Sequence, residues 1–360
     1  MQVGEDFIAS EPLRWIHRTL ADKEVYFVAN PTPRALQARC AFRITGMTPE
    51  AWFPDTGRIA PLAMFHESDG YTRMPLDFEP SGSMFVVFKK GPIKPSERLF
   101  SITCDGKTLL GMDLTGAGIT KPAQTQPATA EVRPAFDPIS RELTQNGAYA
   151  LKMADDRTLE INLTSLPEPL AITGPWEVTF PPGAGAPEKL VMDKLVSWSE
   201  HSDAGVKHFS GSATYRKTFA FTPSPPLPAH LAPRIHLDLG KVSVMAAVQL
   251  NGKDLGILWK PPYRVDITDA VKAGDNVLEV RVVNLPINRM IGDELLPEDS
   301  ERNKNGTLKQ WPQWWLDGKP SPSGRFTFTS WRLWKKDAPL QESGLLGPLT
   351  VRTVARVELK

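Results

Sequence analysis

The sequence predicts an all-β protein with two β-sandwich domains. Apolar and polar residues alternate in short runs between residues 209 and 284, for example in residues 235–239, which read IHLDL. A period of two places one face of a strand in the core and the other in water. The dipeptide Asn251-Gly252 follows such a run, and it is typical of a two-residue hairpin turn because that turn needs positive φ. With 34 Pro and 26 Gly, the chain also has the turn residues that many short strands require.

The charge balance argues against a nucleic-acid partner, and the hydropathy pattern argues against a membrane. The 360 residues carry 42 Lys and Arg against 41 Asp and Glu, which gives a formal net charge of +1. This balance provides no field that would gather polyanions. No apolar run approaches the roughly 20 residues of a membrane span, and the first residues lack the features of a signal peptide. Length alone favours about two domains.

Three segments with different patterns are expected along the chain. Residues 1–110 contain short alternating runs at a spacing of about ten residues, which indicates a small β-sandwich. Residues 111–145 are rich in Pro and Ala, cannot build a core, and are predicted to be a linker or a surface strap. Residues 146–360 begin with a hairpin and form the second sandwich. No repeat, heptad pattern or long helical pattern is present.

The motifs of the second domain occur in an order that resembles a known family. They read FSGSATYRKTF (209–219), LDLG (237–240), LNGKDLG (250–256), WKPPYRVD (259–266) and NVLEVRVVN (276–284). Together they resemble the galactose-binding-like jelly roll of family 2-type glycosidases.

Further motifs narrow the resemblance to the C-terminal region of the α-L-rhamnosidases of glycoside hydrolase family 106. In the second domain these are GPWEVTF (174–180), TFTSW (327–331) and SGLLGP (343–348). In the first domain the runs IHR (16–18), VYFVAN (25–30), EAWFPDTG (50–57) and SMFVVF (83–88) resemble the small β-sandwich that follows the catalytic barrel in those enzymes.

The resemblance implies that the catalytic equipment is absent from this chain. In that family the acid and base carboxylates, and the calcium ion that holds the sugar, are expected on a (β/α)₈ barrel. Nothing here alternates strands with long amphipathic helices, and two sandwiches leave no room for roughly 250 further residues. The chain alone is therefore expected to be inactive, with calcium ligands in the missing barrel, and the barrel itself is an expected partner. The family also suggests a periplasmic or extracellular location.

A sugar site is expected on loops of the second domain. Eight of the ten Trp residues follow residue 170, and aromatic faces cover the apolar C–H patches of a pyranose. The strand-end segment after residue 284 adds polar groups that could bind hydroxyls. The candidate carbohydrate-binding residues are Asn288, Arg289, Asp293, Trp311, Trp314 and Trp315. The alternatives are a loop braced by Arg289 and Asp293, and Trp rings buried under a long loop.

Other patterns are expected to be structural. The acidic run from Asp293 to Glu301 could ligate calcium, although a solvated loop is the favoured interpretation. The pair Glu294 and Glu298 is the kind that a glycosidase needs, but it lies where turn residues are expected. Trp176, Tyr215 and Trp259 are predicted to be core or corner residues, since each lies in or beside a strand pattern. Cys40 and Cys104 are expected to be reduced and buried.

Two classes of function follow from these patterns. The first is a non-catalytic, carbohydrate-binding or accessory portion of an α-L-rhamnosidase-like enzyme, acting on rhamnose-containing plant or pectic polysaccharide. The second is a free-standing glycoside hydrolase with a site on its sandwiches. A scaffold without sugar affinity is a further alternative.

Overall fold

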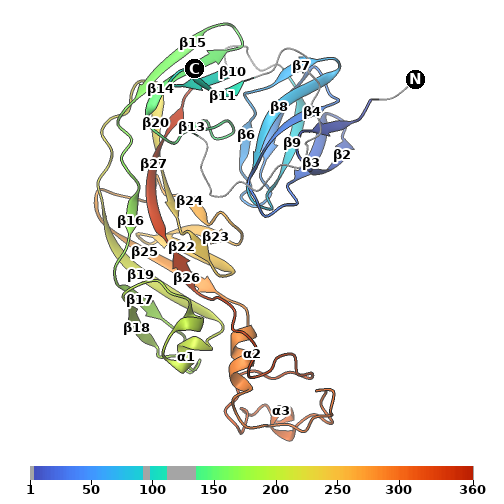
Figure 1. Cartoon of the computed structure of the whole chain (residues 1–360), viewed down its shortest axis with the longest axis vertical. Helices are drawn as coiled ribbons and strands as arrows, with labels where there is room; N and C mark the ends of the chain where they lie inside the picture. Colours follow the sequence, from blue (N-terminus) through green and yellow to red (C-terminus); the bar gives the residue numbers. More distant parts are fainter. Residues whose placement is uncertain (1–3, 92–97, 112–134, 360) are drawn as a thin grey trace. The chain divides into compact units, whose positions relative to one another are not determined.

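The computed structural model describes residues 4–91, 98–111 and 135–359, and it confirms the predicted all-β class (Figure 1). Packing divides the chain into two compact units. Unit 1 comprises Met1–Glu168, Ser224–Ile235 and Thr353–Lys360, and unit 2 comprises Pro169–Pro223 and His236–Arg352. The few helices of the described part are too short or too polar to cross a membrane.

The first part of unit 1 is a sandwich of two antiparallel sheets. One sheet has the strand order β2 (Arg14–Thr19), β3 (Lys23–Ala29), β9 (Ser83–Lys90), β5 (Met47–Trp52) and β6 (Ile59–Pro61). The other has the order β1 (Phe7–Ala9), β4 (Leu36–Phe42), β8 (Tyr71–Phe78) and β7 (His66–Ser68). Every second residue of β8 is buried, which is the period of two that a sheet with one dry face requires.

The core of this sandwich is rich in aromatic rings and contains one of the two cysteines. Tyr26, Phe42 and Phe88 are fully buried there, and the Tyr26 and Phe42 rings meet edge to face at 4.9 Å. Cys40 is buried in the same cluster, and Cys104 is buried elsewhere in unit 1. Both thiols are free, as the sequence predicts, and burial raises the pKa of each one.

The remainder of unit 1 contains a third antiparallel sheet with a separate core. Its strand order is β11 (Lys107–Gly111), β10 (Leu99–Cys104), β14 (Gly147–Met153) and β15 (Thr158–Leu163). Beside it, β12 (Phe136–Asp137) pairs with β13 (Glu142–Leu143), and β13 pairs with the last residues of β27 (Leu349–Val357). Leu151 and Leu163 are fully buried in this core.

These pairings place the boundaries of the compact units away from residues 110 and 146. The hairpin β14–β15 pairs with β10, because β10 offers it a free edge, and so residues 147–163 lie in unit 1. Residues 112–134 of the expected linker lie outside the described residues. Residues 136–143 of that segment form β12 and β13. The two compact units thus have different boundaries from the three segments expected from the sequence. The division into three segments stays a prediction.

Unit 2 contains a six-stranded antiparallel sheet. Its strand order is β18 (Lys189–Met192), β17 (Trp176–Thr179), β19 (Ser212–Phe221), β25 (Gly274–Val283), β22 (Met245–Leu250) and β23 (Lys253–Leu258). The predicted hairpin turn joins β22 to β23, with φ values of 52° at Asn251 and 82° at Gly252. These positive angles explain why the turn uses Asn and Gly.

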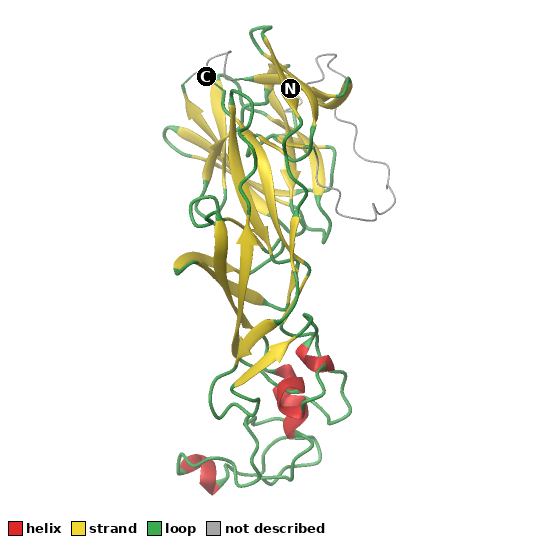
Figure 2. Cartoon of the chain, turned by 90° about the vertical axis from the view of Figure 1, so that its left-hand side faces the viewer, coloured by secondary structure: helices red, strands yellow, loops and turns green. Residues whose placement is uncertain are grey.

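Shorter pairings complete unit 2. β16 (Leu170–Ile172) pairs with the first residues of β27, β20 (Leu231–Asp238) pairs through its last residues with β24 (Arg264–Asp266), and β21 (Lys241–Val242) pairs with β26 (Leu345–Gly347). The helical elements are a 3₁₀ turn (Trp198–Glu200), α1 (Ala204–Lys207), α2 (Ile287–Asp293) and α3 (Gln313–Leu316). Figure 2 shows α2 and α3 in a loop-rich region beyond the strands of this unit.

The core of unit 2 is built around buried aromatic rings. Trp176 and Tyr215 are 1% and 0% exposed, which confirms their predicted core positions, and Trp198 stacks parallel to Tyr215. Gly344 has a φ of 96°, and a Cβ there would come within 2.7 Å of the Tyr215 hydroxyl. Only glycine fits at this position.

The prediction that Trp259 is a core or corner residue is wrong. Its side chain is 56% exposed, and that of Ile257 is 59% exposed. Trp259 comes directly after β23, an edge strand of the six-stranded sheet in which every residue is exposed or only partly buried, so its ring lies next to a part of the sheet that the core does not cover.

Candidate functional site

The candidate site lies in residues 285–344, which connect β25 to β26 and contain α2 and α3 (Figure 1). Helix α2 starts directly after Pro286 and buries Asn288, Arg289, Ile291 and Asp293. Three of these four residues are polar, and all three were candidates for sugar binding. Their hydrogen bonds show what each one holds.

Asn288 is 2% exposed and fixes the backbone near residue 341. Its Nδ2 donates to the Gln341 carbonyl oxygen at 2.7 Å, and its Oδ1 accepts from the Gln341 amide at 2.7 Å. A buried amide with both of its groups satisfied is stable where it lies. The Asn288 side chain therefore connects α2 to the backbone of Gln341.

Arg289 is 8% exposed and contacts two other parts of unit 2. Its Nη2 donates to the Ala184 carbonyl oxygen at 2.8 Å, and its guanidinium lies 4.3 Å from the centre of the Phe326 ring. Burial lowers the pKa of this guanidinium, and the nearby Asp293 carboxylate acts in the opposite direction. A cation–π contact that is shielded from water is worth about 2 kcal/mol.

Asp293 holds the returning part of the segment onto the end of α2. It is 2% exposed, and its Oδ2 accepts from the amides of Phe326 and Thr327 at 3.0 and 2.6 Å. The Thr327 hydroxyl also donates to it at 2.7 Å. Hydrogen bonds to a charged group are stronger than those between neutral groups. The Asp293 carboxylate therefore holds the backbone at Phe326 and Thr327 in place.

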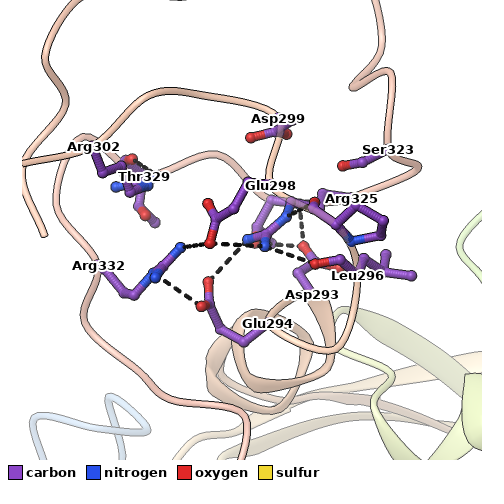
Figure 3. Close-up of polar contacts among 12 residues, drawn as sticks. Asp293, Glu294, Leu296, Glu298, Asp299, Arg302, Ser323, Arg325, Thr329 and Arg332 are labelled. Atoms are coloured by element: carbon purple, nitrogen blue, oxygen red, sulfur yellow. Dashed lines mark hydrogen bonds and ion pairs between the residues drawn. The ribbon is translucent and has the colours of Figure 1, made fainter.

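A network of arginines and glutamates extends this bracing (Figure 3). Arg325 Nη1 lies 2.9 Å from Glu294 Oε1, and its other nitrogens donate to the carbonyl oxygens of Leu296 and Pro297. Arg332 forms ion pairs with both Glu294 and Glu298. Each glutamate thus has an arginine partner within this network.

A small cavity lies beside this network. Its volume is about 20 Å³, which is room for about one water molecule. Lining residues include Glu294, Arg302, Arg325, Phe328 and Trp334. Because a sugar ring cannot enter a space of this size, any sugar bound here has to lie on the surface.

The aromatic residues of the segment gather around Phe328. The Trp315 ring stacks on Phe328 at 4.3 Å with an interplanar angle of 23°, and Trp311 lies 5.7 Å from the same ring. Trp314 meets Phe328 edge to face at 5.5 Å and donates its Nε1 to the Asp299 carbonyl oxygen. Trp311 and Trp315 remain 54% and 46% exposed. The predicted Trp residues are thus brought together, and two of them are about half exposed.

The structure separates the six predicted residues into two groups. Asn288, Arg289 and Asp293 are buried residues of α2. The three Trp residues lie in α3 or just before it. Phe328, Arg325 and Arg332 were not among the predicted site residues. They belong to a non-periodic stretch in which neither strand nor helix patterning marks a position, so the pairing of Arg325 with Glu294 left no signal in the sequence.

The acidic run is engaged by cations and by the protein backbone. Besides the arginine pairs, Glu301 pairs with Lys309, and Asp299 Oδ2 accepts from the Ser321 hydroxyl at 2.7 Å. Across the part of the chain that the structure describes, no three His, Cys, Asp or Glu side chains form a group suited to a metal ion.

Two family models match separate parts of the sequence. Residues 1–66 match the α-L-rhamnosidase model of glycoside hydrolase family 106, and residues 190–308 match the galactose-binding domain-like model of glycosyl hydrolase family 2. The structure of a rhamnosidase from Novosphingobium sp. PP1Y superposes on 97% of this chain, with a TM-score of 0.64 and 27% sequence identity. The chain is related to the family 106 α-L-rhamnosidases. Its residues 190–308 are similar to the galactose-binding domain of the family 2 enzymes.

This rhamnosidase-related chain is much shorter than the proteins it matches. It covers 25% of the Novosphingobium rhamnosidase. A protein of Formosa agariphila described as a putative β-glucuronidase is 41% identical over 213 residues, which are 59% of this chain and 18% of that protein. Both matches support a relationship to glycoside hydrolases, of which the chain spans a quarter or less.

Proposed function

We propose that the chain is a carbohydrate-binding accessory portion of a rhamnosidase-like glycoside hydrolase. The observation that carries the proposal is the aromatic cluster around Phe328, in which Trp311 and Trp315 expose about half of their side chains. Contiguous exposed apolar patches often mark binding sites. Trp faces suit the apolar side of a pyranose, and the jelly-roll framework is of a galactose-binding-like kind.

In this proposal the buried polar residues act by holding the platform. Asp293 and Arg325 tie residues 325–327 to α2, and Phe328 follows directly. A rigid platform loses little conformational entropy when a ligand binds, so its affinity for a weak ligand is higher. Asn288 holds the backbone at residue 341 against α2, and Arg289 holds α2 against the Ala184 carbonyl oxygen. Their role is support, with the Trp rings touching the sugar.

Hydrolysis is assigned to a partner domain in this proposal. The tempting pair Glu294 and Glu298 is occupied by arginines. The proposed partner is a catalytic barrel like that of the family, and the proposed ligand is a rhamnose-containing plant glycan. Two apolar residues exposed on and just after the edge strand β2, Ile16 and Leu20, offer a surface on which such a domain could dock.

The proposal is tested by titrating the chain with rhamnose and with pectic oligosaccharides while following Trp fluorescence. A saturable change with an affinity near millimolar is expected, because a shallow platform buries few ligand atoms. Trp315→Ala and Trp311→Ala should weaken binding. Trp259→Ala, which removes an equally exposed ring elsewhere in unit 2, is the matched control and should bind like the wild type. Absence of any saturable change would favour the scaffold alternative.

A further inference from the structure

A second aromatic platform lies in the same segment. The Trp331 ring is 55% exposed, and its Nε1 donates to the Asn305 carbonyl oxygen at 3.0 Å. Gly306 lies against the ring, since a Cβ at this glycine would be 3.4 Å from Trp331 Cδ1. Among the described residues no other ring stacks on Trp331, so the ring is held by its Nε1 hydrogen bond while more than half of the residue stays exposed.

The backbone limits the distance between Trp331 and the cluster around Phe328. Thr307 forms an antiparallel bridge with Trp331, the Leu308 amide donates to Ser330 and the Arg332 amide donates to Gly306. Residues 306–308 therefore run beside residues 330–332. Phe328 and Trp331 are three residues apart, and their Cα atoms can be separated by at most about 11 Å.

We infer that the site takes a chain of two or more linked sugars, with one unit on the Trp311–Trp315 platform and another on Trp331. This inference rests on the proposed function. A single pyranose covers one indole face and leaves the other platform exposed. When two units are linked, engagement of the second platform becomes intramolecular and is favoured by its high effective concentration. The ligand class is accordingly an oligosaccharide or the end of a polysaccharide.

The test compares ligands of increasing length. Rhamnose and size-fractionated di-, tri- and tetrasaccharides of a pectic polysaccharide are titrated by calorimetry against the wild type, Trp331→Ala, Trp331→Phe and the control Trp259→Ala. Affinity should rise by at least about tenfold from the monosaccharide to the tetrasaccharide in the wild type and the control. Trp331→Ala should reduce this ratio to near one. Trp331→Phe keeps a ring but loses the bond to Asn305, and it should retain most of the gain.

Each other outcome overturns the inference in a recognisable way. Saturable binding with equal affinity for all lengths leaves the proposed function standing and refutes the two-platform arrangement. A length-dependent gain that persists in Trp331→Ala refutes the role of Trp331. Absence of binding at every length refutes the inference together with the proposed function. If Trp331→Ala instead abolishes self-association in light scattering without affecting the titrations, the exposed rings, with Leu316 and Leu333 beside them, form a protein interface.

Discussion

Arg325 and Glu294 form an ion pair of 2.9 Å in which the two side chains are only 6% and 15% exposed. They lie 31 residues apart in the sequence, so the pair closes a long loop that has little regular secondary structure. Arg325 also donates to two backbone carbonyls, and both charges are compensated. The geometry of the aromatic platform depends on this closure.

Arg325→Ala is therefore expected to loosen the loop selectively. Removing one partner of a buried pair costs about 3–5 kcal/mol where the other charge is left without compensation. Glu294 keeps its ion pair with Arg332, so the cost of this substitution should be smaller. Local opening of residues 294–334 limits how much of this cost reaches global unfolding. Hydrogen exchange and limited proteolysis should show faster opening of this segment. Arg216→Ala breaks an exposed pair with Glu279 and serves as the control, with an effect below about 1 kcal/mol.

Gly344→Ala is expected to destabilise unit 2 strongly. The new methyl group would lie within 3 Å of both Tyr215 and Trp198 at a φ of 96°, so the chain would have to move away from the aromatic core. We expect a loss of at least about 3 kcal/mol in the free energy of unfolding. Gly274→Ala also has positive φ but meets open space. A comparable loss in both variants, measured by urea denaturation, would contradict the packing explanation.

Asp77 is expected to make the stability of unit 1 depend on pH. Burial raises its pKa to about 7, with further contributions from the Asp137 and Glu79 carboxylates, and its Oδ2 has no hydrogen-bond partner among the described residues. An acid whose pKa is higher in the folded state stabilises the fold while it is protonated. Stability should therefore fall as pH rises from about 4 to about 7, by on the order of 3 kcal/mol. Asp77→Asn should remove this dependence in denaturation curves measured across that range.

Trp176→Ala and Trp259→Ala should give opposite results in thermal unfolding. Trp176 is fully buried, and its truncation should cost about 3–5 kcal/mol. Trp259 is more than half exposed, so its truncation should leave the melting temperature close to that of the wild type. A large loss at Trp259 would mean that its ring is covered in solution.

Sequence patterns were sufficient wherever a residue's neighbours along the chain determine its structure. The alternation around Leu237 and the turn at Asn251-Gly252 are local, and the strands and the hairpin occur where they were predicted. The position of Trp259 depends on whether another strand covers β23, and that is a property of the sheet order. Alternation alone could not reveal this.

The candidate site was predictable only in part for the same reason. The concentration of Trp residues drew attention to residues 311–315, and the structure does gather them. The contacts that organise them, from Phe328 and from Asp293 to Thr327, join positions that are tens of residues apart in a segment without periodicity. Such pairings depend on tertiary packing, which leaves no repeating mark in one sequence.

The distribution of Cys and Trp gives each compact unit its own spectroscopic reporter. Both cysteines lie in unit 1, where they are buried, whereas eight of the ten Trp residues lie in unit 2. A thiol reagent added to the wild-type protein can modify Cys40 only after unit 1 opens, while the fluorescence spectrum reports mainly on unit 2. One unlabelled sample can thus show whether the two halves unfold together or in sequence.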